Sequence, residues 1–71
     1  MANIFECVAC ETAVTAAIAA TLGETVLMAK AIIAALSALG LLGGASLEQV
    51  EKILEATTDP HTICKELGAC S

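Results

Sequence analysis

The residues best able to do chemistry in this chain are four cysteines, placed in two pairs near its two ends. Cys7 and Cys10 are three positions apart, and about fifty alanine-rich residues separate them from the second pair, Cys64 and Cys70. On a helix, residues three apart have Cβ atoms about 5–6 Å from each other, whereas a disulfide needs about 3.8 Å. Bonds between the pairs are therefore favoured over bonds within them. If the first and last segments run antiparallel, the disulfides are Cys7–Cys70 and Cys10–Cys64.

The unequal spacing of the two pairs constrains the last segment. Six helical residues rise about 9 Å and three rise about 4.5 Å, so the pairs match only if the chain leaves the helix near Gly68 or crosses at an angle. In the chain-entropy model, closing a loop this long stabilises the fold by about 4 kcal/mol for the first bond, and by less for the nested second bond. A chain of 71 residues needs such cross-links, because a core of this size seldom suffices alone.

Two other uses of the cysteines have less support. Structural zinc sites use C-x2-C pairs, and His61 is a further candidate ligand, but the spacing of Cys64 and Cys70 departs from the zinc template. A thioredoxin-like motif requires a strand that leads into a helix, and the segment around Cys7 and Cys10 lacks that context. We therefore expect no metal and no cofactor. The chain also offers no nucleophile beside a base and no glycine-rich phosphate loop, so we do not expect an enzyme.

The composition predicts one small, all-helical domain over residues 1–71. Apolar residues make up 58% of the chain, and Phe5 is the only aromatic residue. The net charge of -5 opposes nucleic-acid binding, which requires clustered cations. An even number of cysteines in so short a chain favours an oxidising compartment, so we expect a protein that is secreted or stored in an oxidising vesicle or granule. The start of the sequence lacks the basic and apolar regions of a signal peptide.

Four helices are predicted, over residues 3–21, 24–42, 47–56 and 60–67. Asn3 is a candidate N-cap for the first helix. Ser46 and Gln49 have the spacing of a capping box at the start of the third helix. Asp59 is a candidate cap for the fourth helix, with Pro60 at its favoured first position.

The middle of the chain is unusually apolar. Residues 26–45 contain only Lys30 and Ser37 as polar side chains, so the second helix is apolar on nearly all sides. Such a helix is buried either in protein or in lipid, and this length just suffices to span a bilayer. Both interpretations stay open, with Gly43 and Gly44 as a candidate hinge that would expose the helix at a membrane. The predicted lipid-contacting residues are Phe5, which is also a core candidate, and Ile32, Ile33, Leu36, Leu39, Leu41 and Leu42.

Both ends of the chain resemble the saposin-like proteins. The start, FECVACETAV, has the C-x2-C opening of that family, and the end, DPHTICKELGAC, is similar to its closing segment, especially in amoebapore-type pore-forming members. Together the two matches cover about a third of the chain. The family's third disulfide, between two middle helices, has no counterpart here, and the middle is shorter. The matching positions at the end are Pro60, Ile63, Cys64, Leu67 and Cys70.

The resemblance implies a helical folded leaf in which two nested disulfides join the first and last helices, and a function at lipid surfaces. We therefore predict a small four-helix saposin-like bundle, most simply an antimicrobial or cytolytic peptide that permeabilises membranes. A non-lytic lipid-binding or lipid-transfer protein, a bacteriocin of the helical-bundle type and a purely structural bundle remain alternatives. Membrane lipids are the expected partners. Self-association is also expected, because so apolar a chain should expose patches that pair.

The acidic balance suggests activation by acid. Protonation of carboxylates below about pH 5 would lower the net charge and the cost of entering lipid. Histidine side chains gain a positive charge over a nearby pH range. The predicted pH-sensing residues are His61, Glu51 and Glu55.

Overall fold

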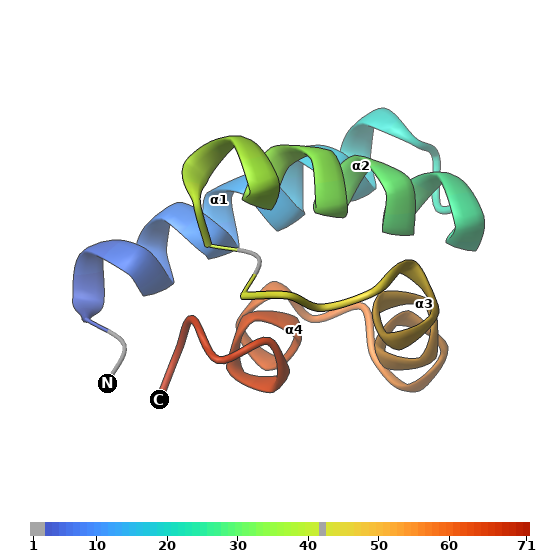
Figure 1. Cartoon of the computed structure of the whole chain (residues 1–71). Coiled ribbons are helices and arrows are strands. Elements are labelled where there is room, and N and C mark those ends of the chain that lie inside the picture. The colour runs from blue at the N-terminus through green and yellow to red at the C-terminus, as the bar shows by residue number, and fades with distance from the viewer. Residues whose placement is uncertain (1–2, 42) are drawn as a thin grey trace.

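The computed structural model describes residues 3–41 and 43–71, and it contains four helices in these ranges. They are α1 (Ile4–Ala20), α2 (Thr25–Leu39), α3 (Leu47–Ala56) and α4 (Pro60–Glu66), and the described residues form no strand. Figure 1 shows α1 and α2 side by side in one layer, with α3 and α4 in a second layer below them. The predicted all-α, four-helix class is confirmed.

Each helix begins at a side chain that accepts a hydrogen bond from a free backbone N–H. The predicted caps are confirmed: Asn3 accepts from the N–H of Glu6, and Ser46 forms a full capping box with Gln49. Asp59 accepts from the N–H of Thr62, ahead of Pro60. The cap of α2 is Glu24, which was predicted as the first residue of that helix. Its carboxylate accepts from the N–H groups of Val26 and Leu27.

The second helix ends earlier than predicted. It stops at Leu39 because Gly40 adopts a left-handed conformation (φ 73°), and its N–H donates to the carbonyls of Leu36 and Ser37. A left-handed glycine after the last helical residue is a common helix terminator. The apolar run 26–45 is therefore not one helix but a 15-residue helix followed by a loop. Gly43 and Gly44 belong to that loop, and Leu42 lies outside the described residues.

The first helix also ends one residue before the predicted Thr21. Thr21 is its C-cap, and the turn into α2 continues through Leu22 (φ 56°) and Gly23 (φ 84°). Glycine enters the left-handed region without strain, whereas leucine does so at a cost of about 1–2 kcal/mol. Leu22 is the one described non-glycine residue with a positive φ.

The core lies where α1 and α2 meet the other two helices. Helix α1 packs against both α2 and α4, and α2 also packs against α3. None of the buried side chains among the described residues is charged or polar, apart from cysteine sulfur. The largest fully buried side chains come from all four helices: Ile32, Leu36, Ile63, Val14, Val50, Cys10 and Cys64.

The two disulfides join α1 to the last segment in the predicted nested order, Cys7–Cys70 and Cys10–Cys64. Their Cα atoms are 4.6 and 6.0 Å apart. The chain leaves α4 after Glu66 and turns at Gly68 (φ 86°), which is the first of the two solutions that the cysteine spacings allowed. Because of this turn, Cys64 and Cys70, which are six residues apart, can both bond to Cys7 and Cys10, which are only three apart on one face of α1.

Candidate membrane-contact surface

The exposed side of α1 carries no charged side chain and consists of apolar residues and two threonines. With 3.6 residues per turn, seven exposed positions fall within about a third of its circumference, and none is charged. Glu11 borders this stripe and is half-buried, whereas the half-buried Glu6 lies away from it. We call the stripe the α1 open face; it consists of Ile4, Phe5, Val8, Thr12, Thr15, Ala16 and Ala19.

The largest apolar side chains of the α1 open face gather at its N-terminal end. Phe5 is 81% exposed, Ile4 73% and Val8 53%. At the other end of the helix, Leu22 in the α1–α2 turn is 95% exposed. Exposed single apolar residues are ordinary in proteins, but a continuous uncharged stripe with such residues at both ends is a feature of interaction sites.

Helix α2 adds a second exposed face that is nearly uncharged. Lys30 and Ser37 are seven residues apart and both lie on it, and Lys30 is the only charged residue of the helix. Leu27 is 51% exposed on the same side. The solvent-exposed surface of the α1–α2 layer therefore carries few charged side chains.

Charge is distributed unequally between the two layers. Residues 3–41 carry four charged side chains, whereas residues 43–71 carry seven in addition to His61. On α3, one face is apolar and inward, and the other carries Glu48, Lys52 and Glu55 in exposed positions. The two layers seen in Figure 1 thus differ in charge: we call α3, α4 and their loops the charged layer, because they carry seven of these eleven charged side chains.

The predicted lipid-contacting residues do not form one exposed surface in this conformation. Phe5 is exposed, so its alternative assignment to the core is wrong, and Leu39 is 52% exposed. Ile32 and Leu36 have no exposed surface, and they could meet lipid only if the bundle opened. Ile33 and Leu41 are half-buried, and Leu42 lies outside the described residues.

Sequence reasoning missed Ile4, Val8 and Leu22 as exposed apolar residues. Ile4 and Val8 are four residues apart and so share a helix face, and an apolar helical face is ordinarily turned inward. The nested disulfides reverse this expectation, because they anchor the opposite side of α1, at Cys7 and Cys10, to the last segment.

The three predicted pH-sensing residues are not brought together. His61 stands at the start of α4 and pairs with Glu11 of α1, with 2.8 Å between Nδ1 and Oε2. The side chains of His61 and Glu11 are 54% and 34% exposed. Glu51 and Glu55 belong to α3, where Glu51 is half-buried and Glu55 exposed.

The His61–Glu11 pair lies against the outer disulfide. Nδ1 of His61 is 4.0 Å from Sγ of Cys7. Ligand atoms of Cys7, Glu11, His61 and Cys70 all lie within 4.8 Å of one another. We call these four residues the outer-disulfide cluster. An open pocket of about 280 Å³ adjoins it, lined by Asn3, Ile4, Cys7, His61 and Ser71.

The pKa of one carboxyl group near this cluster is shifted. Hydrogen bonds from the hydroxyl and from the backbone N–H of Thr62 hold the pKa of Asp59 below its usual value, and nearby His61 contributes less. Both bonds go to Oδ2, at 2.8 and 3.0 Å respectively. Because these donors favour the ionised carboxylate, the cap of α4 is a charged one.

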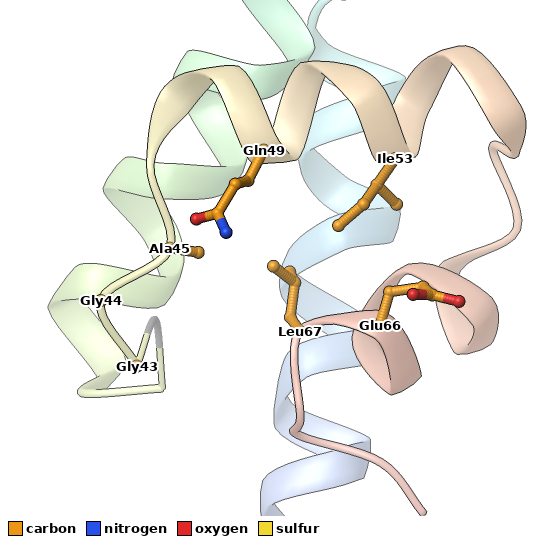
Figure 2. Close-up of a pocket in the computed structure, with 7 residues that line it drawn as sticks. All are labelled: Gly43, Gly44, Ala45, Gln49, Ile53, Glu66 and Leu67. Carbon is orange, nitrogen blue, oxygen red and sulfur yellow. The ribbon is translucent and has the colours of Figure 1, made fainter.

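A shallow groove runs along the junction of α3 and α4. Figure 2 shows its first part, where the side chains of Ile53 and Leu67 point toward each other from the two helices. This part measures about 250 Å³, and Gln49 on its rim is already engaged in the capping box. A second part of about 390 Å³ shares Ile53 and Glu66 with the first and extends to Thr57.

The two disulfides indicate an oxidising, non-cytosolic environment, because reducing systems keep cytosolic thiols free. Among the helices of residues 3–41 and 43–71, none has both the length and the apolar content needed to cross a membrane. Comparisons of the chain with protein-family models, with curated proteins and with solved structures found no match.

Proposed function

We propose that this chain is a secreted or vesicle-stored, saposin-like protein that binds membrane lipids and permeabilises membranes. The observation that carries the proposal is the α1 open face, an uncharged stripe with Ile4, Phe5 and Val8 exposed at one end. Protein covers α1 on one side only, and the side that it leaves open carries no charged side chain. Exposed apolar side chains that gather in one place are typical of interaction sites.

The size of the apolar surface sets how strongly it can bind. Fully burying one large apolar side chain gains about 1.5–3 kcal/mol, so covering the exposed parts of Ile4, Phe5 and Val8 gains roughly 5 kcal/mol. That corresponds to a dissociation constant of about 0.1–1 mM. One copy therefore docks reversibly, and durable binding requires either further residues, such as Leu22, or several copies at one site.

Charge determines which membranes this surface favours. The chain carries a net charge of -5, and Lys30 is the only cation in the α1–α2 layer. Anionic lipid attracts basic segments and repels acidic ones, so at neutral pH the protein should bind neutral vesicles better than anionic ones. Stronger action at acid pH, where carboxylates lose charge, remains a prediction of the sequence.

Dye release from vesicles tests the proposal, with neutral and anionic lipid at pH 7 and pH 4.5. The test variant is Phe5→Ser, which removes the most exposed apolar side chain of the α1 open face. The matched control is Leu47→Ser, which removes an exposed apolar side chain from the charged layer. Phe5 is 81% exposed, so its replacement should move stability by no more than about 0.5 kcal/mol. Leu47 is 37% exposed, so circular dichroism must first show that Leu47→Ser keeps the helix content of the unmodified protein.

We expect release by the unmodified protein, a reduction of at least about threefold for Phe5→Ser, and no change for Leu47→Ser. A threefold effect corresponds to a free-energy difference of about 0.7 kcal/mol, which is well below the free energy gained by fully burying one aromatic side chain. Equal losses in the two variants would show that the α1 open face is not the contact surface. No release and no vesicle binding under any condition would overturn the function itself.

The groove between α3 and α4 favours one alternative, a non-lytic lipid carrier. Its two parts are joined at Ile53, and the second part, beside Ile53 and Ala56, has a mainly apolar lining that an acyl chain could contact. A carrier would bind vesicles without releasing dye and would retain lipid through purification. Mass spectrometry of the native protein, together with Ile53→Ser as a groove variant, separates this alternative from permeabilisation.

A further inference from the structure

We propose that opening the Cys7–Cys70 disulfide turns the outer-disulfide cluster into a binding site for one zinc-type cation. The four ligands would be the thiolates of Cys7 and Cys70, Nδ1 of His61 and a carboxylate oxygen of Glu11. In the oxidised protein the two sulfurs are bonded to each other, and only His61 and Glu11 remain as ligands. The site is therefore controlled by the redox state of one disulfide, independently of any action on membranes.

The geometry is already close to that of a tetrahedral site. Zinc binds thiolate sulfur at about 2.3 Å and nitrogen or oxygen at about 2.0–2.2 Å, so neighbouring ligand atoms lie about 3.3–3.8 Å apart. The nitrogen of His61 is 4.0 Å from Sγ of Cys7 and 2.8 Å from Oε2 of Glu11. Once the sulfurs separate, shifts of about 1–2 Å suffice to place all four ligands around one ion, and the exposed His61 and half-buried Cys7 and Glu11 can make most of them.

The donor set favours a particular class of cation. Two thiolates, one imidazole and one carboxylate are soft to borderline ligands, which suit Zn²⁺ and disfavour Ca²⁺ or Mg²⁺. Cys7 and Glu11 are four residues apart on α1, so they project from the same side of one helix. The other two ligands come from the last segment, and a bound ion would replace the disulfide as the link between these elements.

The outer disulfide is the more accessible of the two. Cys10 and Cys64 are both fully buried, and Cys70 of the outer bond is also buried. Cys7, however, is half-buried and lies beside the exposed imidazole of His61, so the outer bond can be reached at its Cys7 sulfur. Thiol–disulfide exchange requires a thiolate to reach a sulfur atom, so a small dithiol attacks the outer bond first. The adjoining pocket beside Cys7 and His61 provides a path for both the reductant and the metal.

The inner disulfide preserves the frame of the site after the outer one opens. Cys10 directly precedes Glu11 on α1, and Cys64 follows His61 by three positions on α4. The Cys10–Cys64 bond therefore keeps the His61–Glu11 pair in register without help from the outer bond.

The chemistry balances with a dithiol as the reductant. The dithiol gives two electrons and two protons to the Cys7–Cys70 bond and becomes a cyclic disulfide, leaving two thiols on the protein. Binding of Zn²⁺ then displaces the two thiol protons into water. After the metal is removed, exchange with a small-molecule disulfide, which accepts two electrons and two protons and becomes two thiols, restores the Cys7–Cys70 bond.

The test is a titration of Zn²⁺ and Co²⁺ into protein whose outer disulfide alone has been reduced. Limited dithiothreitol treatment, followed by alkylation and mass mapping of a sample, establishes which bond is open. We expect one ion per chain, thiolate-to-cobalt charge-transfer absorption with Co²⁺, and no binding to the oxidised protein. His61→Ala and Glu11→Gln should each weaken binding at least about tenfold, since loss of even an outer-shell partner costs 10–100-fold.

Glu66→Gln is the matched control, because Glu66 is an exposed carboxylate on α4 outside the cluster. Circular dichroism follows helix content throughout, and if opening the outer bond loosens the fold, metal should restore helicity in the unmodified chain but not in His61→Ala. The proposal is overturned if affinity is the same in His61→Ala and the unmodified protein. It is also overturned if one ion binds per two chains, or if Glu66→Gln weakens binding as much as Glu11→Gln.

Discussion

Leu22 combines two unfavourable features at a single residue. Its backbone is left-handed (φ 56°), and its side chain is 95% exposed. Asparagine tolerates this conformation better than leucine, so Leu22→Asn should stabilise the protein by up to about 1 kcal/mol. For a domain of this size, that raises the Tm by about 4–8 °C. The same change should weaken vesicle binding if the α1–α2 turn enters lipid.

Leu39→Asn is the control for Leu22→Asn, because Leu39 is also exposed but has helical backbone geometry. It should not raise the Tm, since asparagine is a poorer helix former than leucine. An equal gain in both variants would show that reduced surface hydrophobicity, rather than relief of backbone strain, is responsible.

Asp59 stabilises the folded protein by an amount that decreases as the pH falls. Its pKa is held below the usual value, first by the hydroxyl and then by the N–H of Thr62. A carboxyl group with a lowered folded-state pKa contributes stability above its unfolded pKa, near pH 4, and loses it as pH falls through the folded value. Asp59→Asn should therefore lower the urea midpoint at pH 6, and the difference from the unmodified protein should shrink toward pH 2. A difference that is constant over this range would contradict the assignment.

The caps at Asn3, Ser46 and Asp59 could be predicted from sequence because each depends on residues within one helical turn. The exposure of Phe5 could not, because it depends on which side of α1 the disulfides hold against the last segment. The pairing of His61 with Glu11 across fifty residues has no local signal at all. At this scale, sequence predicts contacts within a turn and leaves contacts between helices open.

At the scale of the elements, two leucines of α2 should contribute very differently to the stability of the fold. Leu36 is fully buried, whereas Leu39 is 52% exposed one turn later. Leu36→Ala should cost about 2–5 kcal/mol, a large share of the roughly 4–11 kcal/mol expected for 71 residues. Leu39→Ala should change stability by no more than about 0.5 kcal/mol. Urea unfolding of both variants measures the contrast, and comparable losses would place Leu39 in the core.

The length of α2 could not be read from its hydropathy. The apolar run continues to residue 45, but Gly40 ends the helix by adopting a left-handed conformation. Gly43 and Gly44 gave the clearer break in sequence, and they only continue the loop. The distinction between a bilayer-spanning helix and a core helix thus depended on one glycine, whose role became evident only with the backbone in place.

At the scale of the whole molecule, the disulfide pairing was predictable and the asymmetry between the layers was not. Four cysteines in two terminal pairs leave few ways to cross-link an antiparallel arrangement, and the turn at Gly68 resolves their unequal spacing. From the sequence alone, the α1 open face is expected to lie in the core. It became a candidate surface because α2 and α4 together cover only its other side.

The nested disulfides lead to a prediction about their unequal contributions. With one bond already in place, the other closes a ring of only about ten residues, so chain entropy gives roughly 3 kcal/mol for either bond. The inner pair adds a packing term, because Cys10 and Cys64 are fully buried and replacing them leaves a cavity. Cys10→Ala/Cys64→Ala should therefore lower the free energy of unfolding more than Cys7→Ala/Cys70→Ala.

Urea unfolding of the two double variants measures this difference, with circular dichroism to follow the helices. We expect the variant without the outer bond to remain folded at 25 °C, and the variant without the inner bond to be partly unfolded or to have the lower midpoint. This order is what allows the outer bond to open while the inner bond keeps α1 against α4. If the outer pair proved the more costly to remove, the frame would depend on Cys7–Cys70, and that bond could not serve as a reversible switch in a folded protein.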